Sequence, residues 1–392
     1  MDGRDILAAG ETPTGPTALR YAEARIDDVD PLRSIAERLG AGPFSLVLLF
    51  VSSEAPFDNL IAASRDLWSG ARVVACSTAG EIGAEGYTDG HIIAAGFPRE
   101  DFAATCLSVE DLSNLDVRPL IDRVVTTQID LSQAHAEMEH GFGFLLIDGL
   151  CLREDVVTAA IAPALGSTPL FGGSAGDGTA FENTRIALDG RVLQDAAVLC
   201  LVRTRFRVKV FSVDHIRPTE HRMVVTGADP ARRRVKSINA EPAAREYGRI
   251  TGLDPDEMGP FAFAAHPVVV RLGGSHHVRA IQRVTDEGEL VFFSAIDEGM
   301  VLSVAEPADI AAHLDASLQR LSDPQPPAAI LSCDCLLRRI EADQRQAGRA
   351  ISDILSRHGV RGFSTYGEQI GSLHVNHTMT GVALYSTEEP SC

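Results

Sequence analysis

Basic residues are scarce in this sequence. It carries 35 lysines and arginines against 54 aspartates and glutamates, which gives a formal net charge of -19 over 392 residues. An electrostatic field of this sign repels phosphate backbones, so the composition excludes nucleic acid as a partner. The charge also helps to keep a protein in solution, and it carries no information about the fold.

Long apolar runs are missing as well. The first 20 residues hold charges and prolines, without the apolar core that a signal peptide needs. The longest apolar run, Phe44–Val51, has the length of a buried strand and is much shorter than the ~20 residues of a membrane span. The seven cysteines are scattered and odd in number, which predicts buried thiols in a reducing compartment. We therefore expect a cytoplasmic protein without a membrane segment.

Several catalytic and cofactor motifs are also absent. The Gly273–Ser275 stretch has neither the lysine of a phosphate-binding loop nor a dinucleotide fingerprint. Ser174 lacks the glycine spacing of a hydrolase nucleophile elbow, and a strand is expected after it. The Cys333 and Cys335 pair has no second cysteine pair, which a structural zinc site needs. These absences argue against a nucleotide-binding loop, a serine hydrolase and a structural zinc site.

An internal repeat is the main positive signal. Apolar residues make up 45% of the chain, enough for a large core. Three stretches share an apolar strand, a helix, a second strand ending in small residues, a glycine, a carboxylate and a later strand. This predicts an α/β fold of mixed sheets with packed helices, in two domains built from related strand–helix–strand units. The first strands are Leu46–Val51, Phe144–Ile147 and Ala329–Ser332; the turn pairs are Gly80 and Glu81, Gly176 and Asp177, and Gly367 and Glu368; the later strands are Ile92–Phe97, Ala196–Val202 and Thr378–Leu384.

One helix and two breaks complete the expected organisation. Apolar residues at helical spacing predict a single helix over Leu336–Ser356, with Glu341 on its polar face and His358 and Gly359 at its end. A charged break at residues 229–234 and a proline-rich spacer at residues 323–327 suggest linkers. The expected division is a tail over residues 1–28, a first domain over 29–232 and a second over 233–392.

The three turn carboxylates allow two interpretations. A carboxylate beside a glycine can accept hydrogen bonds from the exposed amides of the turn, which would make Glu81, Asp177 and Glu368 turn-stabilising residues. Alternatively they line a shared cleft, where two carboxylates with different pKa values could act as general acid and base. The enzyme interpretation requires at least two of them to meet in one accessible cleft.

The C-terminal segment from Tyr366 to Thr378 is the candidate ligand site. It is rich in polar side chains although apolar strands flank it, which is typical of a turn or a cleft. His374 and His377 are three positions apart and would face opposite sides of a strand, so we do not expect them to share a ligand. A neutral imidazole is a common ligand of haem iron.

At these residues the sequence resembles the FIST family. Signature-like segments span about residues 30–387. Two departures are Ala240, where the family has glycine, and His377, where a polar residue such as glutamine is expected. The similar segments are Val74–Ile82 and Phe171–Asp177 in the N-terminal FIST domain, Ser237–Ala243 at the entry to the C-terminal FIST domain, and Asp334–Arg339, Gly362–Gln369 and His374–Asn376 in its closing signature.

The resemblance implies an intracellular sensory protein that binds a small ligand and is not an enzyme. The closing signature is most similar to the nitric-oxide-sensing haem branch, whose members work with histidine kinases or cyclic-di-GMP enzymes. This chain carries no motif of either kind, so it would signal through a separate partner. The rival interpretations are an enzyme that uses the turn carboxylates and an interaction scaffold without a ligand.

The polar C-terminal segment coincides with this closing signature, and it supplies the expected site residues. The expected iron ligand is His374, with Cys335 and His377 as alternatives. The expected lining of the pocket is Tyr366, Glu368 and Asn376.

Overall fold

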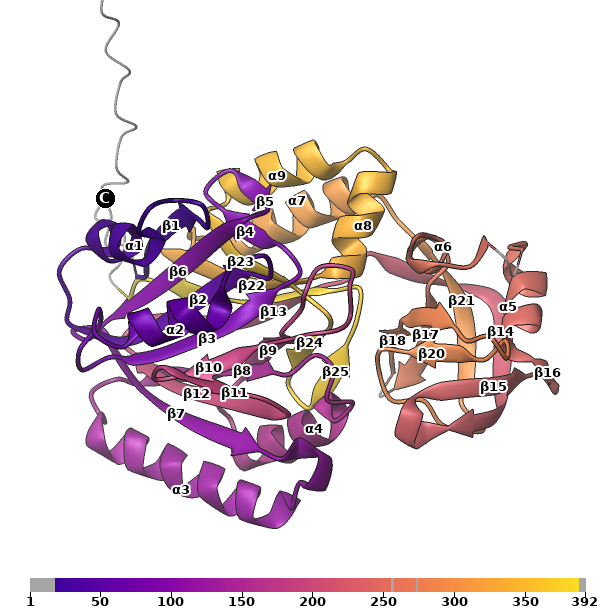
Figure 1. Cartoon of the computed structure of the whole chain (residues 1–392), viewed down its shortest axis with the longest axis horizontal. Coiled ribbons are helices and arrows are strands. Elements are labelled where there is room, and N and C mark those ends of the chain that lie inside the picture. The colour runs from indigo at the N-terminus through magenta and orange to yellow at the C-terminus, as the bar shows by residue number, and fades with distance from the viewer. Residues whose placement is uncertain (1–17, 255–256, 273, 388–392) are drawn as a thin grey trace, which may run out of the picture.

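The computed structural model describes residues 18–254, 257–272 and 274–387. Three six-stranded sheets form a body, and an eight-stranded sheet forms a smaller lobe beside it (Figure 1). The fold is therefore mixed α/β, as predicted. None of the helices in these residues is long and apolar enough to cross a membrane.

The first body sheet contains the first predicted unit. Its order is β1 (Arg20–Arg25), β6 (His91–Pro98), β2 (Phe44–Ser52), β3 (Arg72–Thr78), β10 (Ile186–Leu188) and β11 (Arg191–Leu193). Its helices are α1 (Pro31–Leu39) and α2 (Phe57–Ser64).

The second body sheet contains the second unit. Its order is β25 (Leu373–Val375), β24 (Glu368–Ile370), β9 (Leu170–Ser174), β8 (His140–Ile147), β12 (Ala196–Thr204) and β7 (Phe102–Glu110). Its helices are α3 (Val117–Ala134) and α4 (Glu154–Ala164), with the short 3-10 helix η1 (Leu112–Asn114) before α3.

The third body sheet contains the third unit. Its order is β13 (Arg207–Val213), β26 (Met379–Tyr385), β22 (Ala329–Cys335), β23 (Val360–Thr365), β4 (Glu81–Gly83) and β5 (Gly86–Thr88). Its helices are α7 (Ile310–Leu321), α8 (Leu336–Gln344) and α9 (Gly348–Arg357).

The three units have the same internal pairing. The strand before and the strand after the helix are parallel in each: β2 with β3, β8 with β9, and β22 with β23. A later strand then pairs antiparallel with the first: β6 with β2, β12 with β8, and β26 with β22. The predicted strand–helix–strand repeat is thus present as three related sheets.

The units exchange their hairpins. The hairpin that follows the second strand of each unit completes the sheet of another unit. The pairings are β4 on β23, β10 on β3, and β24 on β9. Because every sheet needs a hairpin from elsewhere in the chain, the three units interlock and the C-terminal strands lie within the body.

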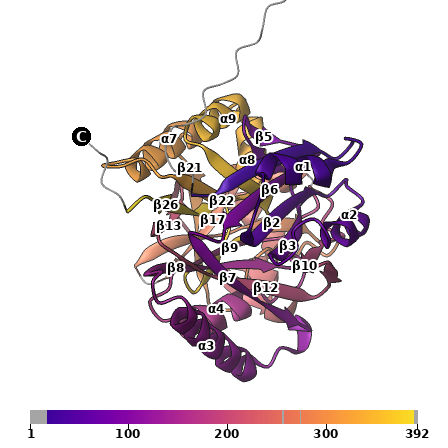
Figure 2. The same cartoon turned by 90° about the vertical axis from the view of Figure 1, so that its left-hand side faces the viewer.

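One apolar core joins the three sheets, and each sheet supplies a phenylalanine to it. Phe50 of β2 stacks on Phe363 of β23 with ring centroids 4.5 Å apart, and it meets Phe144 of β8 edge-on at 6.4 Å. Helices cover the outer faces: α1 and α2 on the first sheet, α3 and α4 on the second, and α7 and α9 on the third (Figure 2).

The lobe has its own core and is inserted between β13 and α7. Its sheet runs β18 (Ser275–Arg279), β17 (Val268–Leu272), β21 (Val301–Pro307), β14 (Ile216–Asp229), β15 (Arg234–Ile238), β20 (Leu290–Phe292) and β19 (Ile281–Val284), with β16 (Glu241–Pro242) on β15. Its helices are α5 (Ala243–Thr251), α6 (Pro260–Ala265) and the 3-10 helix η2 (Pro230–Arg232).

The lobe also contacts the body through an apolar surface. The rings of Phe181 and Tyr366 from the body and Phe293 from the lobe pack together, with centroids 4.6 Å apart for Phe181 and Tyr366 and 5.4 Å for Phe181 and Phe293. Helix α6 of the lobe lies against α8 of the body. The lobe is therefore packed onto the body near the C-terminal signature.

The prediction of one helix over Leu336–Ser356 is wrong. Gln346 takes a left-handed conformation with φ of 55°, and the N–H of Ala347 bonds the carbonyl of Ala342 at 2.7 Å, so the chain breaks between α8 and α9. The helix does end at His358 and Gly359, as predicted. The expected domain boundary at residue 232 falls between β14 and β15, which pair with each other, and the spacer at residues 323–327 connects α7 to β22.

Candidate functional site

The three glycine turns meet at one place. They follow β3, β9 and β23, so they lie at the carboxyl ends of the parallel strand pairs, the side of an α/β sheet where ligands usually bind. Main-chain hydrogen bonds close a ring between the turns: Ala79 N–H to Ser364 O at 2.9 Å, Ser174 N–H to Gly367 O at 2.8 Å, and Gly176 N–H to Ser77 O at 3.1 Å.

Two of the turn carboxylates have equivalent partners. Glu81 and Glu368 each accept a bond from the threonine hydroxyl three positions earlier, and each accepts one from the main-chain N–H ten positions later. The donors are Thr78 and His91 for Glu81, and Thr365 and Thr378 for Glu368. Both side chains are buried, and burial raises the pKa of Glu81 to about 7 and that of Glu368 to about 8, against the opposing effect of these bonds.

Asp177 stabilises its turn in a different way. Its carboxylate accepts bonds from the N–H groups of Phe181 at 2.8 Å and Asn183 at 2.6 Å, and from the hydroxyl of Tyr366. Tyr366 thereby ties the third unit to the second. All three carboxylates bind turn amides or turn hydroxyls, so the turn-stabilising interpretation describes their observed contacts.

Four buried side chains meet where the lobe touches the turns, and we name them the junction cluster: Gln369, His374, Asn376 and Arg279. Gln369 Nε2 donates to His374 Nδ1 at 3.3 Å, and Arg279 of the lobe donates to the His374 carbonyl at 3.3 Å. Four polar atoms of the cluster are buried without a hydrogen-bond partner in the described part of the chain: Gln369 Oε1, His374 Nε2, Asn376 Oδ1 and Arg279 Nε.

The tautomer of His374 follows from these contacts. Gln369 Nε2 also donates to the Gly367 carbonyl at 3.5 Å, so it is the amide nitrogen and His374 Nδ1 must accept. Burial lowers the pKa of His374, so the ring is neutral and carries its proton on Nε2. A metal-binding histidine has the opposite arrangement, with its second nitrogen donating a proton to an acceptor.

The candidate ligands as arranged do not fit a haem. A Cβ built on Gly367 would lie 2.8 Å from His374 Nε2, so the main chain occupies the space beside that nitrogen. The Nε2 of His377 is bound to Glu341 at 2.9 Å. The thiol of Cys335 is buried, and burial raises its pKa well above the usual value, which disfavours a thiolate ligand.

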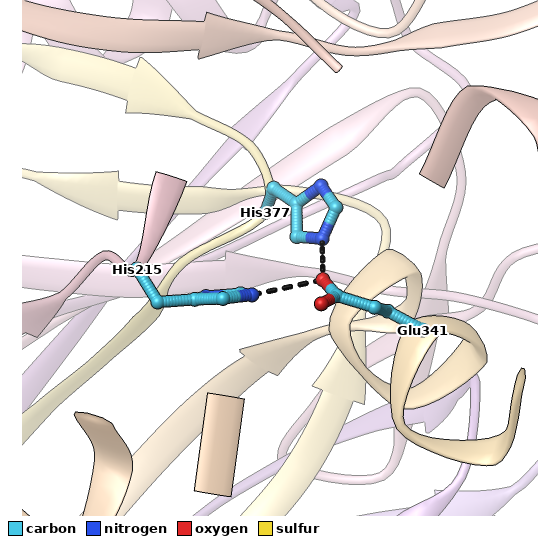
Figure 3. Close-up of side chains that lie close together, drawn as sticks. All are labelled: His215, Glu341 and His377. Atoms are coloured by element: carbon cyan, nitrogen blue, oxygen red, sulfur yellow. Dashed lines mark hydrogen bonds and ion pairs between the residues drawn. The ribbon is translucent and has the colours of Figure 1, made fainter. Parts of the chain in front are cut away.

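A second buried cluster lies at the root of the lobe, and we name it the hinge cluster: His215, Glu341, His377 and Arg338. Glu341 Oε2 accepts from His215 Nε2 at 2.8 Å and from His377 Nε2 at 2.9 Å (Figure 3). His215 lies between β13 and β14, where the chain enters the lobe, and its carbonyl accepts from the N–H of Ala308 on the returning connection at 2.9 Å. The cluster thus holds both connections to the lobe.

The hinge cluster has the residue types of a metal site, but the imidazole nitrogens that face Glu341 carry protons and so cannot bind a metal ion. Arg338 Nη1 lies 2.9 Å from His215 Nδ1, and a guanidinium can only donate, so His215 carries its proton on Nε2 and donates a hydrogen bond from there to Glu341. Burial lowers the pKa of His215 to about 4. Burial alone would raise the pKa of Glu341, but the bonds from His215 and His377 lower it to about 2. A buried carboxylate bridging two imidazole N–H groups accounts for the geometry without a metal.

The structure separates the predicted site residues into two groups. Tyr366, Glu368, His374 and Asn376 lie around the turns, whereas His377 belongs to the hinge cluster, as expected for histidines that do not share a ligand. Sequence reasoning missed Arg279 and His215 as site residues, included Gln369 only as part of the C-terminal segment, and placed Glu341 on the polar face of a helix although the side chain is 1% exposed. His215 and Glu341 are 126 positions apart, so no local pattern could pair them.

An open pocket of about 320 Å³ lies near the end of β3. It is lined by Ser77 of β3, by Asn183 and Arg185 before β10, and by Ser53 and Asp58 near the start of α2. Arg185 bonds Asn183 and lies 3.9 Å from Asp58, so the pocket offers charges of both signs.

Comparisons with known proteins agree with this architecture. Residues 45–241 match the FIST N domain and residues 243–371 match the FIST C domain. No curated protein matches the sequence. The two matches together cover most of the chain, including all three turns and most of the lobe. The chain therefore belongs to the FIST family, whose domains are sensory and signalling domains.

Proposed function

We propose that this protein is a sensor that binds a small polar ligand at the junction cluster and signals through a separate protein. The observation that carries the proposal is that each of the four residues of this cluster has a buried polar atom with no partner among the described residues. Burying a polar atom without a partner costs roughly 1–3 kcal/mol, so such atoms are usually satisfied by water or by a ligand.

The atoms of the cluster define what the ligand must offer. Gln369 Oε1 and Asn376 Oδ1 accept hydrogen bonds, while His374 Nε2 and Arg279 Nε donate them. The ligand therefore carries at least one donor and one acceptor. It is small, because the surrounding side chains are buried and the Gly367 main chain lies against the His374 ring.

A ligand here would contact both parts of the molecule. Arg279 comes from β18 of the lobe, and the other three residues come from the body. A ligand that bonds both sides changes the relative stability of the docked and undocked lobe, which is how binding becomes a signal. The family resemblance offers a histidine kinase or a cyclic-di-GMP enzyme as the receiving partner.

Variants of the junction cluster test the proposal once a thermal-shift screen of small metabolites has identified a ligand. Gln369→Ala and Asn376→Ala each remove one bond and should weaken binding roughly tenfold by calorimetry. Gln128→Ala is the control, because Gln128 is a half-buried residue of α3 whose side chain bonds Leu165 and Thr168, away from the junction cluster. Circular dichroism establishes that each variant is folded.

Two outcomes would contradict the junction cluster as the ligand site. If Arg185→Ala weakens binding while Asn376→Ala does not, the ligand occupies the open pocket instead. If added haemin gives a Soret band that shifts with nitric oxide and disappears in His374→Ala, the haem prediction is correct and the ligand is not a small polar molecule.

A further inference from the structure

Two thiols face each other across a pair of strands in the second body sheet. Cys106 of β7 and Cys200 of β12 are directly opposite in the antiparallel register. Their sulfur atoms are 3.5 Å apart, and both are free thiols. Among the described cysteines, they form the pair whose thiols are hydrogen-bonded to each other.

The position of the pair allows the sulfurs to approach further. A disulfide needs sulfurs about 2.05 Å apart and Cβ atoms about 3.5–4.5 Å apart, while directly opposite residues of an antiparallel pair have Cβ atoms about 4.5–5.5 Å apart. The Cβ atoms of Cys106 and Cys200 therefore need to move only a short distance toward each other for a disulfide to form. The β7 strand is the edge strand of its sheet, so it can shift toward β12 without displacing a further strand.

The two thiols differ in their access to solvent. Cys106 is 8% exposed and lies on the edge strand, whereas Cys200 is 0% exposed on the inner strand. The hydrogen bond from Cys106 and burial both raise the pKa of Cys200 well above the usual value, so this thiol is protonated at neutral pH. An oxidant therefore meets Cys106 first, and Cys200 is placed to react second.

We propose that Cys106 and Cys200 form a reversible cross-strand disulfide when the protein meets a peroxide. The Cys106 thiolate attacks one peroxide oxygen, which gives a sulfenic acid and, after proton uptake, one water. The Cys200 thiol then loses its proton as its sulfur attacks the sulfenic sulfur, the S–S bond forms, and the sulfenic hydroxyl takes up a proton and leaves as a second water. Two thiols and one hydrogen peroxide thus become one disulfide and two waters. A reducing dithiol reverses the change by exchange.

This modification site is separate from the proposed ligand site. The pair lies between β7 and β12, whereas the junction cluster involves β24, β25 and the lobe at the other edge of the same sheet. The disulfide would join an edge strand to its neighbour. Oxidation of the two thiols therefore does not depend on the ligand.

Peroxide treatment followed by alkylation under denaturing conditions tests the pair. We expect two thiols to become resistant to alkylation, non-reducing peptide mapping to show a cross-link between the segments of residues 106 and 200, and dithiothreitol to reverse both changes. The mass of the protein stays that of a monomer because the bond is within one chain.

Single variants separate this pair from other thiols. Cys106→Ala and Cys200→Ala should each abolish the cross-link, while Cys151→Ala, which removes a half-buried thiol outside the pair, should leave it intact. Circular dichroism identifies any variant that does not fold. In that case, non-reducing peptide mapping of the wild-type protein decides whether Cys106 and Cys200 are cross-linked. The proposal is overturned if both thiols stay alkylatable at a peroxide dose that oxidises Cys151, or if the bond joins Cys76 to Cys333 instead.

Discussion

Glu368 shows how a single buried group can make stability depend on pH. Its partners are the hydroxyls of Thr365 and Thr378 and one main-chain N–H, all of them neutral. The folded-state pKa of about 8 lies above the ordinary value of 4.5, so the folded protein keeps this proton to higher pH than the unfolded chain does. The stabilisation is present in full below pH 4.5 and is lost as the pH rises toward 8.

We therefore expect Glu368→Gln to stabilise the protein in base. Glutamine has the same shape and no charge, so the free energy of unfolding at pH 9 should rise by roughly 3 kcal/mol over the wild type and change little at pH 5. Urea unfolding at both pH values measures the difference. Glu81→Gln should act in the same direction from a pKa of about 7, and exposed Glu54→Gln should have little effect at either pH. An equal effect of Glu368→Gln at pH 5 and pH 9 would disprove the pKa argument.

His215 makes the stability of the protein depend on pH in the acidic range. Its folded-state pKa of about 4 lies below the ordinary value of 6.5, so the unfolded chain takes up this proton first as the pH falls. The stabilisation is complete above pH 6.5 and is lost as the pH falls toward 4. The stabilisation that depends on His215 is lost in acid, and the stabilisation that depends on Glu368 is lost in base. The protein should therefore be most stable at an intermediate pH.

Among the elements, the ion pairs between helix α4 and the lobe are made by one arginine. Arg233 follows η2, and its side chain, 3% exposed, pairs with Glu154 at 2.5 Å and with Asp155 at 3.0 Å at the start of α4. It also donates to the carbonyl of Phe293. The neighbouring Arg232 is 71% exposed and pairs only with Asp229 of its own turn among the described residues. Two adjacent arginines therefore have different energetic roles.

Arg233→Ala should destabilise the lobe contact by about 3–5 kcal/mol, because it leaves the buried Glu154 carboxylate without its cation. Arg232→Ala should change the free energy of unfolding by less than about 0.5 kcal/mol, as expected of a surface ion pair. Hydrogen exchange should speed up at the start of α4 and near Phe293 in the first variant. If both variants behave alike, the lobe is held mainly by its apolar contacts.

At the scale of the whole molecule, the strong acidic charge predicts no useful affinity for nucleic acid. With a net charge of -19, association with DNA or RNA at physiological salt should be undetectable in a filter-binding titration. Tight binding that weakens steeply with added salt would mean that a local basic face overcomes the total charge.

The three units of the body interlock, so they do not form separate domains in space although they follow one another along the sequence. Each body sheet is completed by a hairpin from another unit, such as β4 on β23 and β24 on β9. Removing the C-terminal strands would leave two sheets incomplete. The lobe, by contrast, is a continuous insertion with its own core, joined to the body at the hinge cluster.

The repeat, the class of fold and the location of the C-terminal signature can be recognised in the amino-acid sequence, because apolar runs, glycine turns and neighbouring carboxylates are local patterns. It did not reveal the break at Gln346, which depends on one left-handed residue inside an otherwise helical pattern. The exchange of hairpins, the contact between Arg279 and His374, and the burial of Glu341 between His215 and His377 arise from the folded arrangement of the chain. These contacts join residues about 36 to 126 positions apart, and burial and proton placement there depend on packing that no local pattern encodes.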